Sequence, residues 1–178
     1  MRMNQGVEWA VHGCTLLAPL WPERGLNLAA LASFHGVPGP YMAKQMQLLS
    51  KAEIVFTSRG KSGGYRLARA PSEISLWEIV CAVDGSTPMF RCTEIRQNGP
   101  CANRREDCRA ACPIAAAFAQ AEQAYRSALV GISLADILTQ VGTNATPAHL
   151  AQVMGWIGGN MTALPGRQSA EPLRPQAT

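Results

Sequence analysis

The sequence predicts a mainly helical domain with one small β-hairpin and one long additional helix, and three observations indicate this fold class. Apolar residues recur at the i, i+3, i+4, i+7 spacing of amphipathic helices in several separate segments. A β-branched and aromatic run followed by a glycine-rich turn is typical of a hairpin. Of the 178 residues, 47% are hydrophobic and 16% are charged, which excludes disordered and low-complexity chains.

Three helices are expected before the hairpin. The first covers about residues 6–18 and ends before Pro19, and its apolar face has helical spacing: Val7, Ala10, Val11, Cys14, Leu17 and Ala18. Asn27 suits the N-cap of a second helix, which must end near His35 because a Gly- and Pro-rich turn follows. A third helix is expected over about residues 40–52, with its apolar face formed by Met42, Met46 and Leu49.

The hairpin and a fourth helix follow. Residues 54–57 and 65–68 are the predicted strands, and the turn between them, SRGKSGG, has a basic tip. Ser75 and Glu78 have the S-x-x-E spacing of a capping box, which begins a helix that Gly85 ends. Its buried face is expected to consist of Leu76, Ile79, Val80 and Val83.

The segment between the fourth helix and Pro113 has no periodicity, and it contains four of the six cysteines: Cys92, Cys101, Cys108 and Cys112. A loop of this length normally has a function. Pro113 opens a long helix to about Val130, and an apolar stripe that requires a partner lies along it: Ile114, Ala117, Phe118, Ala121, Tyr125, Ala128 and Leu129. Shorter helices are expected at 134–138 and 147–156, and the end from Gly158 is expected to be mobile.

Charge and cysteine usage restrict the class of protein further. Residues 1–70 contain eight basic and three acidic groups, a net charge of +5, which fits contact with phosphates. We find no secretory signal and no membrane span in the pattern, so we expect a cytoplasmic protein that does not bind a membrane. In a reducing compartment six cysteines favour metal binding or redox chemistry over disulfides.

Three helices followed by a hairpin is the element order of a winged helix-turn-helix, which places its third helix in the major groove of DNA. The outward side of that helix is expected to present Tyr41, Lys44 and Gln45, followed by Leu48 and Lys51. Pro40, at the start of the helix, is also expected to contact DNA. Arg59 and Lys61 at the hairpin tip suit phosphate or minor-groove contact. The alternative is a basic hairpin on a helical scaffold that binds another protein.

Residues 28–85 resemble the IscR/NsrR/BadM-type winged-helix transcription regulators, most specifically in the run RGKSGGYRLARAPSEISLWEIVCAVDG. The similarity extends more loosely over about residues 1–140. It implies a homodimer, held by the long helix, that reads a palindromic site in double-stranded DNA. It also implies four regions, namely a winged helix-turn-helix domain at 1–86, a cluster-binding loop at 87–112, a dimerisation region at 113–140 and a C-terminal extension at 141–178.

The cysteine spacing itself is unlike that of a structural zinc site. Eight, six and three residues separate Cys92, Cys101, Cys108 and Cys112, whereas zinc knuckles use short pairs. Cys112 directly precedes Pro113, so it is expected at the N-cap of the long helix, where the helix dipole lowers the pKa of a thiol. Cys14 and Cys81 lie on apolar helix faces and are expected to be structural.

The segments FRCTEIRQNGP and CRAACPIA resemble the RsrR-like redox-sensing branch of this family, whose members hold a two-iron, two-sulfur ([2Fe-2S]) cluster. The resemblance implies two Cys ligands from one subunit and a Glu and a His from the other. The matching positions are Cys92, Cys112, Glu8 and His35.

Several alternatives to these ligands stay open. His12, one helical turn from Glu8, is the rival histidine, and Cys101 and Cys108 are the rival thiols. Trp9, beside Glu8, could relay a change in the ligands, although a helical Trp usually packs in a core.

The expected function is a homodimeric DNA-binding repressor whose DNA affinity depends on the redox state of a cluster at the subunit boundary. No nucleophile-base pair, phosphate loop or H-E-x-x-H motif indicates an enzyme. The alternatives are a nitric-oxide or iron sensor that uses Cys92, Cys101 and Cys108, and a zinc-stabilised interaction module.

Overall fold

The computed structural model describes residues 3–58, 60 and 63–164, and it confirms the mainly helical fold with a small antiparallel sheet. Before the hairpin lie α1 (Gln5–Leu17), α2 (Leu28–His35) and α3 (Gly39–Lys51). The hairpin consists of β2 (Val55–Ser58) and β3 (Gly64–Leu67). Four helices follow: α4 (Leu76–Asp84), α5 (Pro113–Val130), α6 (Leu134–Asn144) and α7 (Pro147–Asn160).

Local hydrogen bonds explain where these helices begin and end. The Asn27 side chain accepts a hydrogen bond from the Ala30 N–H at 2.8 Å and caps α2. Gly36 ends α2 at a φ of 62°, a left-handed conformation that few residues other than glycine adopt readily. Ser75 and Glu78 form the predicted capping box at the start of α4.

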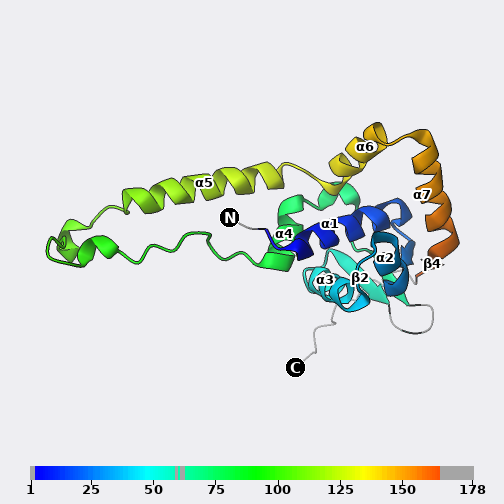
Figure 1. Cartoon of the computed structure of the whole chain (residues 1–178), viewed down its shortest axis with the longest axis horizontal. Helices are drawn as coiled ribbons and strands as arrows, with labels where there is room; N and C mark the ends of the chain where they lie inside the picture. The colour runs from blue at the N-terminus through cyan, green and yellow to red at the C-terminus, as the bar shows by residue number, and fades with distance from the viewer. Residues whose placement is uncertain (1–2, 59, 61–62, 165–178) are drawn as a thin grey trace, which may run out of the picture.

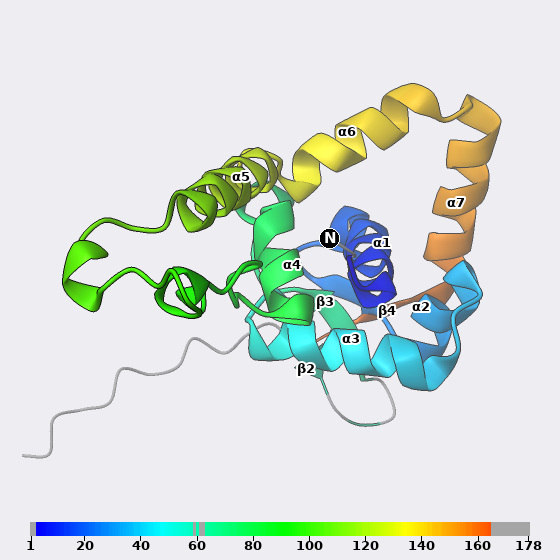
Figure 2. The same ribbon diagram turned by 60° about the vertical axis from the view of Figure 1, so that its left-hand side comes forward.

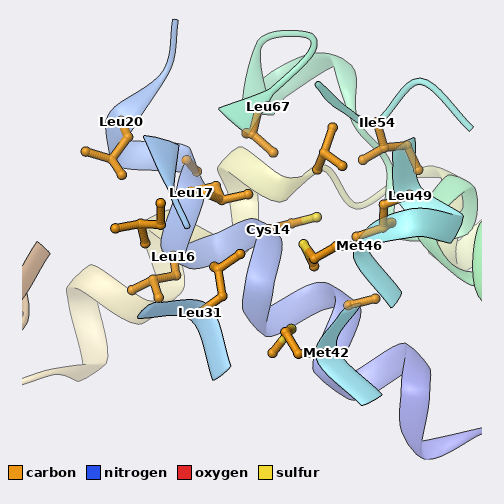
Figure 3. Packing of buried hydrophobic residues seen from close by; sticks show 14 of the residues in the cluster. Cys14, Leu16, Leu17, Leu20, Leu31, Met42, Met46, Leu49, Ile54 and Leu67 are labelled. Atoms are coloured by element: carbon orange, nitrogen blue, oxygen red, sulfur yellow. The ribbon is translucent and has the colours of Figure 1, made fainter. Parts of the chain in front are cut away.

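The hydrophobic core lies where α1, α2, α3 and the sheet meet (Figure 3). Cys14 lies near its centre together with Leu17 and Met46, and all three side chains are fully buried. Burial raises the pKa of the Cys14 thiol to about 12, so this cysteine stays protonated and packs as a small apolar residue. Burial also raises the pKa of the Cys81 thiol.

Two short strands, β1 (Arg24–Leu26) and β4 (Met161–Ala163), extend the hairpin into an antiparallel sheet of order β2-β3-β1-β4. Neither strand is predicted by the sequence pattern. The expectation of a mobile end from Gly158 is wrong for residues 158–164, because they complete α7, pair with β1 and bury Leu164. Residues 165–178, Arg59 and Lys61 lie outside the described residues.

Helix α5 and the loop before it project from the head formed by α1–α4 and the sheet (Figure 1). Helix α6 follows α5 and passes above α1, and α7 then runs down and ends beside α2 (Figure 2). The loop includes two short 3-10 turns, Ile95–Gln97 and Arg105–Asp107. In the described part of the chain, no helix is long and apolar enough to cross a membrane.

The arm formed by the loop and α5 touches the head mainly through α4. Trp77 of α4 packs edge-on against Tyr125, with ring centroids 6.0 Å apart, and the Arg126 guanidinium lies 5.7 Å from the Trp77 ring. Within the described structure no residue of α5 is buried, and Ile114 and Phe118 are 61% and 51% exposed. The apolar stripe predicted for this helix is therefore present and largely exposed in the single chain.

Candidate functional site

Helix α3 presents the candidate DNA-reading surface. Tyr41 is 56% exposed, and Pro40 and Lys44 beside it are also exposed. The ring of Trp9 from α1 lies against the Tyr41 ring with a centroid distance of 5.6 Å. The exposed first turns of α3 therefore rest directly on α1, and they leave a cationic and an aromatic side chain free for a groove.

Gln45 does not lie on this surface, which corrects the prediction that it faces outward. Its side chain is 4% exposed, and its Oε1 atom has no hydrogen-bond partner among the described residues. A Cβ atom on Gly6 of α1 would lie 2.8 Å from both Oε1 and Nε2 of Gln45, so the amide packs against the α1 backbone. The spacing shows why, because Gln45 is the i+3 position of the stripe that begins at Met42.

A polar hollow lies between the end of α3 and the hairpin, lined by Gln47, Ser50, Lys51, Thr57 and Tyr65. The Thr57 hydroxyl donates a hydrogen bond to the Ser50 Oγ atom at 3.1 Å. Hydroxyl groups and a lysine suit a phosphate oxygen. Sequence reasoning missed this feature, although a polar residue on the α3-facing side of a short strand could have indicated it.

Cys92 and Cys112 come together at the start of α5. Cys112 is the N-cap residue, as predicted, and the nearby backbone N–H groups of Ala115 and Ile114 lower the pKa of its thiol. The Cys92 side chain and the positive charge of Arg96 lower this pKa further. Both cysteines are half-buried, so the pair offers two adjacent sulfur ligands, one of which is disposed to be a thiolate.

Two sets of contacts hold this loop in place. The Arg96 guanidinium bridges the loop, donating to the Glu94 carboxylate at 2.6 Å and to the Ala110 carbonyl at 2.7 Å. The Glu94 N–H in turn donates to the Cys92 sulfur at 3.4 Å.

The second set attaches the start of the loop to α5. Phe90 stacks on Phe118 with a centroid distance of 4.5 Å and an interplanar angle of 14°. The Met89 N–H donates to the Glu122 carboxylate at 3.1 Å. These contacts fix the chain two and three residues before Cys92, and nothing in the sequence pattern predicts them.

The rival thiols are placed differently. Cys101 is exposed, and Cys108 is half-buried. Among the described residues, no three Cys, His, Asp or Glu side chains gather as a metal site within the single chain. The three-Cys alternative with Cys92, Cys101 and Cys108 is therefore not assembled.

Glu8 and His12 lie one turn apart on α1, and both line a shallow hollow on the exposed side of that helix. The His35 ring packs against the His12 ring at a centroid distance of 5.3 Å. The Nε2 atom of His35 is buried with no hydrogen-bond partner in the described structure. Burial lowers the pKa of His35 and the nearby His12 lowers it further, against a hydrogen bond to the His12 backbone that raises it.

The predicted ligands thus form two separate halves. The loop and the start of α5 lie at the end of the arm, whereas α1 lies in the head (Figures 1 and 2). The structure brings Cys92 to Cys112 and Glu8 to His12, with His35 behind His12.

A winged helix-turn-helix head with an exposed reading helix is the architecture of a DNA-binding transcription regulator. Residues 3–140 match the model of the Rrf2 family, described as iron-dependent transcriptional regulators. The chain belongs to this family, which consists of regulators and not of enzymes. The predicted resemblance to IscR-type regulators is confirmed at this level.

Individual relatives support the assignment to this family. The chain is 35% identical to an HTH-type transcriptional regulator of Synechocystis sp. over 77% of this chain and 87% of that protein. It is 32% identical to an rrf2-like regulator of Rhodobacter capsulatus over 65% of this chain and 75% of that protein.

Two solved structures share the fold. IscR of T. potens matches with a TM-score of 0.60 at 21% identity, over 85% of this chain and 96% of the other. CymR, the global cysteine regulator of B. subtilis, matches with a TM-score of 0.60 at 17% identity, over 79% and 98% of the two chains.

Proposed function

We propose that this regulator is a homodimeric, cytoplasmic repressor that senses redox state through a [2Fe-2S] cluster bound between its two subunits. The observation that carries the proposal is the division of the candidate ligands into two halves. Cys92 and Cys112 meet at the start of α5, and Glu8 and His12 share one face of α1. Each half offers two ligands, and a cluster of this type requires four.

The long helix supports a dimer. Its apolar stripe is largely exposed in the described chain, with Ile114 61% and Phe118 51% exposed. An exposed apolar face of this length normally marks an interface. In a two-fold dimer the same face packs on itself, and each arm then extends toward the other subunit's head.

The residues fit the chemistry of the cluster. The Cys112 thiol has a lowered pKa, so it is disposed to supply a thiolate. We assign His12 as the second ligand on α1 in place of His35, because His12 is exposed beside Glu8 whereas the Nε2 atom of His35 is buried. Histidine and carboxylate ligands make such a site less negative than four thiolates would, which raises its reduction potential.

When bound, the cluster would supply a reversible one-electron change in charge. The residues of α1 would transmit that change because this helix packs on α3 through the contact of Trp9 with Tyr41 and of Gly6 with Gln45. A small displacement of α1 therefore alters the exposed first turns of α3. A switch of this kind requires the two states to differ in DNA affinity by about 1–3 kcal/mol, or roughly 5–150-fold.

The test is anaerobic purification followed by a visible spectrum with iron and sulfide analysis, before and after dithionite. We expect about two irons and two sulfides per cluster and reversible bleaching. A DNA duplex selected by the protein from a random library should then bind with different affinity in the two states. A colourless protein that takes up no iron on reconstitution, or one whose DNA affinity ignores the redox state, would refute the proposal.

Matched variants identify the ligands. Cys92→Ser and Cys112→Ser should lose the cluster, whereas Cys101→Ser and Cys108→Ser, in the same loop, should retain it. Loss of the cluster in the Cys101 and Cys108 variants would instead favour the three-Cys sensor.

A further inference from the structure

A row of four aromatic rings connects the C-terminal helix to the candidate ligands on α1. Trp156 of α7 packs on Phe34 with a centroid distance of 4.8 Å and an interplanar angle of 62°. Phe34 meets His35 at 4.9 Å and 79°, and His35 meets His12 at 5.3 Å and 56°. These distances and tilted geometries lie in the range in which aromatic rings attract one another.

The far end of this row is firmly attached to the head. Ile157, next to Trp156, is 2% exposed. Directly after α7, strand β4 pairs with β1, and the Leu164 N–H donates to the Glu23 carbonyl at 3.2 Å. The sheet therefore holds the C-terminal end of the helix that carries Trp156. The Trp156 ring packs against Phe34 from this fixed position.

Ring packing orients the histidines at the other end. A metal-binding histidine is usually oriented by a hydrogen bond that its second ring N–H donates to a carboxylate, a backbone carbonyl or a water. Here the ring that packs against His12 is His35, which is hydrogen-bonded to the His12 backbone and also contacts the Phe34 ring, and whose Nε2 atom has no hydrogen-bond partner among the described residues. The orientation of the His12 ring thus depends on what supports His35.

We propose that Trp156 is a positioning residue for the cluster site, which acts through Phe34 and His35 to hold the His12 imidazole in its ligating orientation. This inference rests on the proposed function, since it assumes that His12 is a ligand. Trp156 lies beyond residues 3–140, the part of the chain that matches the family model.

The test compares Trp156→Leu, which removes the ring, with Trp156→Phe, which retains an aromatic ring. Trp21→Leu is the matched control, because Trp21 is 41% exposed and lines a hollow with Ile157 of α7 to which none of the four ring residues contributes. Thermal unfolding of each variant verifies that the head remains folded.

Readouts on both the apo and the reconstituted protein are needed. In the apo protein, the NMR signals of the His12 and His35 ring protons should shift in Trp156→Leu and remain in place in Trp21→Leu. In the reconstituted protein, Trp156→Leu should lose its cluster to a chelator about tenfold faster, at the lower end of the effect of outer-shell partners on metal affinity. The EPR spectrum of its reduced cluster should also change, and Trp156→Phe should restore both properties.

The outcomes separate the two proposals. A wild-type protein that binds a cluster, with unchanged EPR and cluster lifetime in Trp156→Leu, would overturn the positioning role and leave the proposed function intact. A wild-type protein that binds no cluster would overturn both. Equal effects of Trp21→Leu and Trp156→Leu would show general destabilisation of α7 and would also overturn the positioning role.

Discussion

Replacing Gln45 by methionine tests whether α3 is placed as the structure has it. The side chain is 4% exposed and its Oε1 atom is unpartnered among the described residues. A buried polar atom without a hydrogen bond costs about 1–3 kcal/mol. Methionine has a similar shape and no such atom, so Gln45→Met should stabilise the protein by about 1 kcal/mol after some loss of packing.

Thermal unfolding provides the assay. For a chain of this size a gain of about 1 kcal/mol raises Tm by about 2–4 °C. Because the Gln45 side chain packs on Gly6 of α1 and not on the reading surface, DNA affinity at fixed salt should change less than about twofold. A variant with unchanged or lower Tm and with relaxed sequence preference would show that Gln45 reads DNA, and it would refute the buried placement of this side chain.

Three further predictions concern other parts of the molecule. Lys44→Ala should weaken binding to all DNA sequences and reduce the slope of log affinity against log salt by about 1, as measured by fluorescence anisotropy over a salt series. Glu78→Gln retains a side-chain oxygen that can accept the capping-box hydrogen bond, and it removes the charge. Burial raises the pKa of Glu78, but hydrogen bonds from Ser75 and Arg69 outweigh this and hold the pKa below its usual value of 4.5. The ionised carboxylate therefore stabilises the fold above that pH, and the contribution disappears as pH falls through the lowered pKa, so the Tm difference between wild type and variant should vanish in acid. The cluster should have a reduction potential above the roughly −400 mV of plant-type all-cysteine clusters, and His12→Cys should lower it in a redox titration because a thiolate replaces a neutral ligand.

Helices with strong local signals were predicted closely. Helix α2 begins after the Asn27 cap and ends at Gly36, and α5 begins at Pro113, because cap and stop residues act over a few neighbouring positions. Strands β1 and β4 were not predicted, since three-residue strands have no periodicity of their own and form only through pairing. The loop before α5 was predicted, but not the stack of Phe90 on Phe118, which depends on the path of the chain.

The parts of the candidate site that depend on local sequence signals were predictable. The N-cap position of Cys112 follows from Pro113, and the spacing of Glu8 and His12 places them on one face of a helix. The contact of His35 with His12 depends on the packing of α2 on α1, which local sequence patterns do not predict. Resemblance alone selected His35, whereas our proposal selects His12 because it is exposed beside Glu8.

Complementation between two inactive variants tests the central claim most directly. One chain has Cys92→Ser and Cys112→Ser, and the other has Glu8→Ala and His12→Ala. They are co-expressed with different affinity tags and purified as a heterodimer. If each site takes ligands from both subunits, the heterodimer has one complete site and should hold about one cluster, whereas neither variant homodimer holds any. A heterodimer as colourless as its parents would contradict a cluster shared across the subunit boundary.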